Sequence, residues 1–489
     1  MKTLKFPNHL AAGFPHRSVI FTLCAVAITM FLSISSTFAA DSTWNVDAAG
    51  DWGNSTNWTS GVPGSTSCTT NTDIATFGAN ITASRVITID ADRNIGGITF
   101  NYNRTAGGDG YSLKNDIRLS SGGVIKEIST ALPSSSRVSR FQNDVRIQGD
   151  GGYATIRNDA TSSNVRMYLN GVSGNSTSGN TTILYLDGSN TAANTISSEV
   201  RDGSNGGNLA IVKTGNGYWR LASPTSNYSG GTTLNAGTLQ YSAGNVTTST
   251  VFGTGALTIN GGTLQNTETA MDTKPFTTIS NTIVVGGNFQ FSARINNTSI
   301  FSGAMDLTGA TRQIGVVSST DSAVILSGVI SNGSLTKTGN RTMILRGENT
   351  YTGNTTVSDG TLILDNTSET LFSIGANGVN NAILGSGTIS LNGTIRFDLS
   401  GADTTAGNSW NIVSVGTLTE TFDAGFTVNS TLGAFTESSG NWTLSNAGKT
   451  WTFQESTGIL NVVPEPGTLA LAGLGLSAIL LTRRRRLRS

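Results

Sequence analysis

The segment KTGNGYWRLASPTSNYSGGTTLNAGTL, residues 213–239, decides the fold because a second copy, KTGNRTMILRGENTYTGNTTVSDGTL, follows at residues 337–362. Both copies begin with Lys-Thr-Gly-Asn, pass through a Tyr and a Thr-Thr pair, and end with Gly-Thr-Leu. They differ by one residue before the Tyr, which indicates a loop insertion. Each copy holds only brief strands with glycine at the corners. Because so thin a unit cannot bury its own apolar face, we expect it to stack on neighbouring units.

Short strand patterns of the same kind run through most of the chain. Apolar residues alternate with polar ones at residues 257–259, 389–391 and 395–399, and Asn-Gly turn pairs follow at 260–261 and 392–393. No amphipathic helix longer than about two turns stands out between the two ends of the chain. The pattern predicts an all-β protein.

The two copies resemble the autotransporter-associated β-strand repeat, which has a Lys-Gly start, a Leu-rich strand, an Asn-Tyr-Gly-Thr-Thr core and a Gly-Thr-Leu end. The resemblance covers about residues 209–241 and 333–364, with weaker echoes at 262–264 and 387–389. It implies an elongated right-handed parallel β-helix, a solenoid in which Leu and Ile fill a narrow core. Leu345 is one of the residues that we expect to point inward.

Aromatic residues mark the corners and the ends of the predicted solenoid. Tyr228 and Tyr351 occupy matching places in the two copies, where we expect packed corner residues; stacking on sugars is the alternative. Most of the tryptophans crowd the two ends of the exported chain: Trp44, Trp52 and Trp58 at one end, and Trp410, Trp442 and Trp451 at the other. Because solenoid ends expose a cross-section of the core, we interpret both clusters as caps. Carbohydrate platforms are the functional alternative.

The N-terminus has the order of a secretory signal peptide. Lys2, Lys5 and Arg17 form a basic region, residues 19–32 are apolar, and small residues lead to a cleavage site at Ala39. We therefore expect a signal helix that a signal peptidase removes, and an exported chain that begins near residue 40. An uncleaved anchor is the alternative.

The C-terminus has three parts in sequence. Pro464, Glu465 and Pro466 come first, an uncharged apolar run at 467–482 follows, and the basic cluster comes last. Sixteen apolar residues span roughly 24 Å as a helix, and the flanking arginines can extend that span slightly. We expect a transmembrane helix whose basic flank stays in the cytoplasm. The cluster consists of Arg483, Arg484, Arg485 and Arg486.

This tail resembles a PEP-CTERM sorting signal over about 26 residues, with Pro464, Glu465 and Pro466 as the motif. The resemblance implies recognition by an exosortase in a Gram-negative bacterium that makes extracellular polysaccharide. It also implies an inner-membrane anchor that precedes delivery to the cell surface or extracellular matrix. A plain anchor with a chance Pro-Glu-Pro is the alternative.

These features divide the chain into five predicted parts. They are a signal peptide (1–39), an N-terminal β-helix portion with a Trp-rich cap (40–200), a β-helix with the two repeats (201–380), a C-terminal β end module (381–462) and the sorting tail (463–489).

Composition excludes several kinds of catalytic site. His9 and His16 lie in the signal region, so the exported chain has no histidine. It therefore cannot form Ser-His-Asp triads, Cys-His pairs or His-containing metal sites. Cys24 leaves with the signal, and Cys68 remains without a disulfide partner. We expect Cys68 to be a buried or incidental thiol, and we expect no metal and no cofactor.

The exported part is mildly acidic. Without the basic residues of both termini and Glu465, it keeps 22 basic and 29 acidic residues, a net charge of −7. This charge argues against nucleic acid as a partner.

The sequence favours a non-enzymatic surface or matrix protein, structural or adhesive, with an exosortase-like enzyme and extracellular polysaccharide as partners. A polysaccharide-active β-helix enzyme, a lyase or a glycosidase, is the alternative. Such an enzyme works with carboxylates, and Asp90 with Asp92, or Asp359, are the candidates. A calcium-stabilised adhesin would need Gly-Asp nonapeptide repeats, which the sequence lacks.

Overall fold

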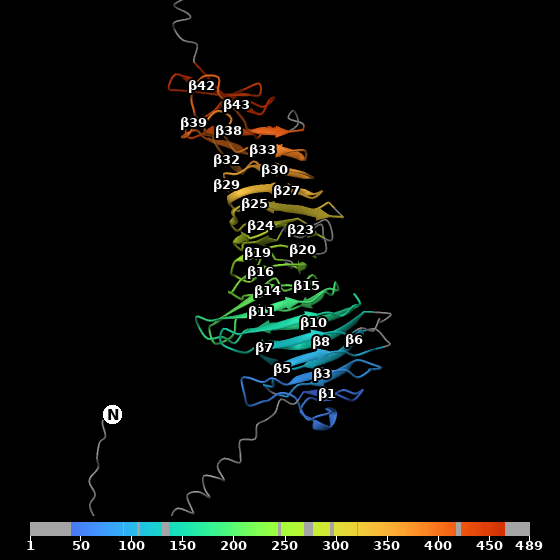
Figure 1. Ribbon diagram of the computed structural model, residues 1–489. Helices are drawn as coiled ribbons and strands as arrows, with labels where there is room; N and C mark the ends of the chain where they lie inside the picture. Colours follow the sequence, from blue (N-terminus) through green and yellow to red (C-terminus); the bar gives the residue numbers. More distant parts are fainter. Residues whose placement is uncertain are drawn as a thin grey trace, which may run out of the picture.

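The computed structural model describes residues 41–464 except 91, 105–107, 130–135, 243–245, 268–276, 294–297, 320 and 417–421. These residues form a parallel β-solenoid of about 12 turns. Figure 1 shows an elongated stack of short strands that runs from β1 (Ser42–Trp44) at one end to β42 and β43 (Lys449–Gln454 and Ile459–Pro464) at the other. The one helix that the described residues contain is a 3-10 turn, η1 (Ser55–Asn57). The all-β prediction and the parallel solenoid are therefore confirmed.

The predicted terminal segments lie outside the described residues. They include the signal peptide with Ala39, the apolar run at 467–482 and the arginine cluster at 483–486. Among the residues that are described, no helix has the length and apolar character needed to cross a membrane.

The largest sheet has 26 strands and contains two parallel ladders that run along the stack. The first ladder contains β1, β3 (Ile74–Phe77), β5 (Asn94–Phe100), β7 (Ile117–Glu127), β9 (Tyr153–Asn158), β11 (Thr181–Asp187), β14 (Asn208–Lys213), β16 (Thr232–Leu234), β19 (Leu257–Ile259), β22 (Ile283–Val285), β25 (Met305–Ser318), β27 (Ile330–Thr338), β30 (Thr355–Val357), β33 (Ile383–Gly385) and β37 (Val413–Val415). The second contains β2 (Gly50–Asp51), β4 (Arg85–Thr88), β6 (Gly108–Lys114), β8 (Arg137–Ile147), β10 (Val165–Ser173), β12 (Asn194–Ile196), β13 (Val200–Arg201), β15 (Tyr218–Leu221), β17 (Thr238–Tyr241), β20 (Thr263–Asn266) and β23 (Phe289–Ala293), which pairs with the long strand β25.

Two further parallel ladders accompany the later turns. One contains β18 (Thr248–Ser249), β21 (Thr278–Ile279), β24 (Ser299–Phe301), β26 (Ala323–Leu326), β28 (Thr342–Leu345), β31 (Thr361–Leu364) and β34 (Thr388–Leu391). The other contains β29 (Glu348–Asn349), β32 (Glu369–Ser373), β35 (Thr394–Asp398) and β38 (Thr427–Ser430), and β39 (Gly433–Ala434) pairs with β38 antiparallel. Parallel strand pairing continues across the two predicted domain boundaries, at residues 200 and 380. The boundaries themselves remain predictions.

An antiparallel sheet ends the stack. Its order is β36 (Ser409–Asn411), β43, β42, β41 (Asn441–Asn446) and β40 (Thr436–Ser438). Strand β43 is therefore held on both sides, by β36 and by β42. An antiparallel sheet stacked on the last turns covers the apolar cross-section that a solenoid would otherwise expose.

The core consists of inward rows in which residues of successive turns lie in register. One row begins with Leu184, Ile211 and Thr232 and continues with Leu257, and all four are buried. Leu345 is fully buried at the end of β28, as predicted. Because side chains of a strand alternate between faces, small polar residues such as Thr233 form the matching outer rows.

Candidate functional site

The two repeat lysines, Lys213 and Lys337, are buried cations whose pKa is lowered by burial. Lys213 ends β14 and points inward, in register between Leu186 and Leu234. It is fully buried, and its Nζ donates hydrogen bonds to the carbonyls of Thr214, of Gly215 at 2.9 Å and of Ala236 at 3.2 Å. Burial lowers the pKa of Lys213 to about 8.

Lys337 repeats this arrangement in the second copy. Its Nζ donates to the carbonyls of Thr338 at 2.9 Å, Gly339 at 2.7 Å and Asp359 at 3.0 Å. Burial also lowers the pKa of Lys337 to about 8. Each lysine Nζ donates hydrogen bonds to three backbone carbonyls and so holds the corner of the coil together. Because its three donors are used in this way, neither lysine is available to a ligand. The sequence placed a lysine at the start of each unit but did not predict its burial.

The glycine at the end of each unit makes room for this lysine. Gly360 has φ +67°, and a Cβ there would stand 2.9 Å from Lys337 Nζ and 2.4 Å from the Gly339 carbonyl oxygen. Gly237 has the same φ in the first unit. The Lys-Thr-Gly start and the Gly-Thr-Leu end of the repeat therefore meet in space and depend on one another.

The repeat tyrosines are packed corner residues, as expected. Tyr228 is buried, and its hydroxyl lies 2.6 Å from Thr232 Oγ1. Tyr351 lies at the same distance from Thr355 Oγ1 and is also buried. Neither ring can stack on a sugar in this arrangement.

The tryptophan clusters cover the two ends. Trp44 packs edge-on against Trp58, with ring centroids 5.2 Å apart, and Trp52 Nε1 donates to the Pro63 carbonyl at 2.9 Å. At the other end Trp410 stacks on Trp451 at 5.7 Å. The six rings are buried, which fits the interpretation as caps and leaves no ring face for a carbohydrate platform.

The candidate carboxylates of an enzyme do not converge. Asp90 pairs with Arg93, whereas Asp92, with φ +55°, pairs with Arg118 at 2.6 Å. The Asp359 carboxylate accepts the Gly360 N–H at 2.8 Å, and its carbonyl belongs to the Lys337 site. Within the described residues, no group of three His, Cys, Asp or Glu side chains could hold a metal ion. Cys68 is exposed rather than buried.

A buried carboxylate that the sequence did not single out is Glu127, at the end of β7. It accepts hydrogen bonds from the Ser129 N–H at 3.0 Å and from Ser139 Oγ at 2.6 Å, and burial raises its pKa. The Arg137 guanidinium lies 4.7 Å from the centroid of the Tyr102 ring beside it. Because Glu127 and Arg137 are both fully buried, the cluster closes a polar corner of the coil and offers no access to a substrate.

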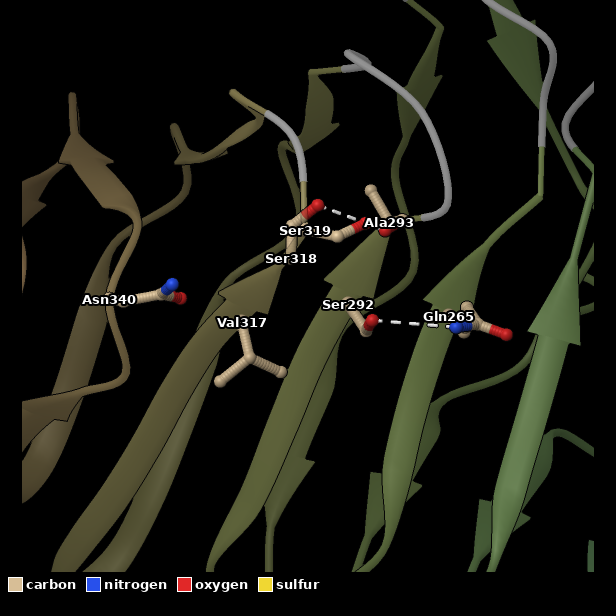
Figure 2. A pocket seen from close by; sticks show the side chains of 7 residues that line it. All are labelled: Gln265, Ser292, Ala293, Val317, Ser318, Ser319 and Asn340. Carbon is tan, nitrogen blue, oxygen red and sulfur yellow. Dashed lines mark hydrogen bonds between the residues drawn. The ribbon is translucent and has the colours of Figure 1, made fainter.

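A polar groove of about 470 Å³ follows the outer side of the second ladder between the two repeats. Figure 2 shows the residues that line it: Gln265, Ser292, Ala293, Val317, Ser318, Ser319 and Asn340. Gln240 Nε2 donates to Gln265 Oε1 at 2.7 Å, and Gln265 Nε2 donates to Ser292 Oγ at 3.4 Å. These hydrogen bonds link Gln240, Gln265 and Ser292 along the ladder, so the groove residues hold successive turns together.

The sorting tail starts within the folded end of the molecule. Pro464 is the last residue of β43 and lies opposite Lys449 of β42, while Val463 lies opposite Thr450. Glu465 and Pro466 lie outside the described residues. The Pro-Glu-Pro motif therefore follows the capping sheet without a spacer.

Comparison with known families confirms both resemblances. Residues 462–486 match the PEP-CTERM protein-sorting motif. The chain carries a sorting signal of this class. Residues 211–240 and 335–364 match the passenger-associated-transport repeat. The sorting motif indicates an exported protein of the cell envelope that an exosortase-type enzyme processes. No curated protein and no solved structure matched the chain.

Proposed function

We propose that this protein is a non-enzymatic structural or adhesive component of the cell surface or extracellular matrix. The observation that carries the proposal is the position of Pro464, where the sorting motif continues directly from the last strand of a capped solenoid. What the motif delivers is therefore a long folded body whose outer rows include polar residues such as Thr233, Thr258 and Gln265. Extended polar faces of this kind suit many weak contacts with polysaccharide or with neighbouring cells.

The proposed route begins with a signal peptidase, which cleaves near Ala39. The apolar run at 467–482 then crosses the inner membrane as a helix, and Arg483 to Arg486 keep its end in the cytoplasm. The exosortase-like enzyme reads the motif from the outer side. We also propose that the solenoid is a right-handed coil.

Replacing Pro464, Glu465 and Pro466 with Ala tests the sorting step. We expect normal export, retention in the inner-membrane fraction and no mature form at the surface or in the medium. Thr436, Glu437 and Ser438, three exposed residues of β40, provide a control triple of alanines with one acidic residue. Normal processing of the Pro-Glu-Pro variant, or equal failure of both variants, would contradict the proposal.

The non-enzymatic character needs a test of its own. We expect no turnover when the full chain is incubated with pectin, alginate or the producer's own polysaccharide. Product that disappears after one Asp→Asn or Glu→Gln change would replace the scaffold with the lyase or glycosidase alternative.

A further inference from the structure

A hollow of about 600 Å³ opens on the outer side of the first ladder, near the N-terminal end of the solenoid. It is lined by residues of β3, β5, β7 and β9, which include two glycine pairs, Gly96 with Gly97 and Gly122 with Gly123. The hollow arises from an irregular register, because β7 has four residues between Leu119 and Val124 where β5 has one. A bulge of this kind displaces backbone and changes the direction of side chains.

Apolar side chains form the walls of this hollow. Ile74 is 37% exposed, and two further lining residues, Val124 and Ile128, are half-buried. Tyr153 is 51% exposed, and its hydroxyl lies 3.9 Å from the place where a Cβ of Gly122 would stand. An exposed aromatic ring at the rim of an apolar-walled hollow is a surface on which a flat ligand can pack.

One cation in the hollow has no partner. Within the described residues, the side chain of Lys126, which lines the hollow and is half-buried, makes no hydrogen bond or ion pair. The neighbouring Arg157 is already neutralised, because its Nε lies 2.5 Å from Asp159 Oδ2 and its Nη1 lies 3.7 Å from Asp187 Oδ2. Within the described part of the chain, Lys126 is therefore a lone cation in the hollow, next to a cluster in which Arg157 is shared by two carboxylates.

The order of these groups restricts the ligand. Thr99, Lys126 and Arg157 lie in register in one outer row, so a hydroxyl, an ammonium and a guanidinium follow one another across adjacent turns. The apolar residues Ile74 and Val124 lie in the next row of the same strands. A wholly apolar ligand would cover Lys126 without pairing it, which is unfavourable. A free inorganic anion would make no use of the apolar wall.

We propose that this hollow binds a carboxylate-bearing sugar ring of an extracellular polysaccharide. The apolar face of the ring lies against Ile74 and Val124, its carboxylate pairs with Lys126, and its hydroxyls bond to Thr99 and Asp159. A charge-assisted hydrogen bond is roughly twice as strong as a neutral one, so the carboxylate sets the specificity. The inference rests on the proposed surface function, because polysaccharide meets the protein only after export.

Binding is measured by titration calorimetry of the purified full chain in detergent with a trisaccharide of uronate units. The comparison ligand is the same trisaccharide with its carboxylates reduced to alcohols. We expect the uronate form to bind at least tenfold more tightly than the reduced form, and Lys126→Gln to remove that preference. Ile74→Asp, which places a negative charge on an exposed wall, should also weaken uronate binding at least tenfold. Lys114→Gln is the matched control, since Lys114 is an exposed lysine of β6 outside the hollow.

Several outcomes overturn the proposal. They are no binding of the uronate trisaccharide, equal binding of its reduced form, equal weakening by Lys114→Gln and Lys126→Gln, and tighter Lys126-dependent binding of an acidic peptide or of anionic lipid vesicles. None of these results affects the processing of the Pro-Glu-Pro motif. The sorting experiment thus fails or succeeds independently of this one.

Discussion

Lys213 and Lys337 lie in different coils of the solenoid and make the same set of hydrogen bonds. Each donates to the two carbonyls that follow it, and to one carbonyl just before the closing Gly-Thr-Leu of its own unit. In both units, therefore, the lysine at the start is hydrogen-bonded to the turn at the end of the same unit. This relationship yields specific expectations about stability.

Replacing Lys337 with Met should strongly destabilise the protein. The methionine fills the space but leaves three partly buried carbonyls without this donor, and an unsatisfied buried group costs about 1–3 kcal/mol. We expect the free energy of unfolding to fall by at least about 3 kcal/mol. Equilibrium denaturation followed by circular dichroism measures it. Lys114→Met is the control at an exposed site, and equal stability of the two variants would exclude the closure role.

Stability should rise at alkaline pH because of the buried lysines. Burial lowers the pKa of Lys213 and Lys337 to about 8, against 10.5 for an unperturbed lysine. Between these values the unfolded chain binds more protons than the folded one, so the free energy of unfolding increases with pH. The comparison is between the wild type and the Lys213→Met/Lys337→Met double variant from pH 7 to pH 10. Parallel profiles of the two proteins would show that the lysines do not titrate in this way.

The closing glycine can be tested against a glycine of similar conformation. Gly360 and Gly378 have φ of +67° and +73°, but only Gly360 is crowded by neighbouring atoms. Ala at either site costs about 1 kcal/mol for the left-handed backbone. At Gly360 we expect a further loss of at least about 2 kcal/mol from displaced backbone and the shifted Lys337. Thermal melting of both variants measures the difference, and similar melting temperatures would contradict the crowding argument.

The direction of Leu345 can be tested against its neighbour on β28. Leu345 is fully buried, whereas Ile344 faces outward and is half-buried. Leu345→Asp places an unpaired charge in the core and should cost several kcal/mol or prevent folding, while Ile344→Asp should cost about 1 kcal/mol or less. Soluble yield and denaturation midpoint report both effects. Equal tolerance of the two changes would mean that the faces of this strand are assigned wrongly.

The repeating part of the fold could be predicted because its signals are local. Glycine corners, Thr-Thr pairs and inward leucines such as Leu345 recur at fixed places in both units, and each place has one physical role. The burial of Lys213 could not be predicted in the same way, because lysine is seldom fully buried and its acceptors include the carbonyl of Ala236, in the turn between β16 and β17.

The sequence predicted the sorting motif but not the hollow around Lys126, because only the motif is a contiguous signal. The sorting motif is a contiguous signal, so Pro464, Glu465 and Pro466 could be read directly. The hollow around Lys126 depends on the offset between β5 and β7, and a pattern of alternating residues does not show where such a bulge will form. Asp90 and Asp92, the candidates of the enzyme alternative, do not act as a pair, because each carboxylate has its own arginine.

The position of Pro464 at the end of β43 has a mechanical consequence. If the C-terminal tail anchors the protein as proposed, every pull on the solenoid passes to the anchor through this strand. β43 lies between β36 and β42, so a force along it loads many hydrogen bonds at once in shear instead of peeling them one by one. On this proposal, the last sheet of the solenoid would bear the load between the folded body and its anchor.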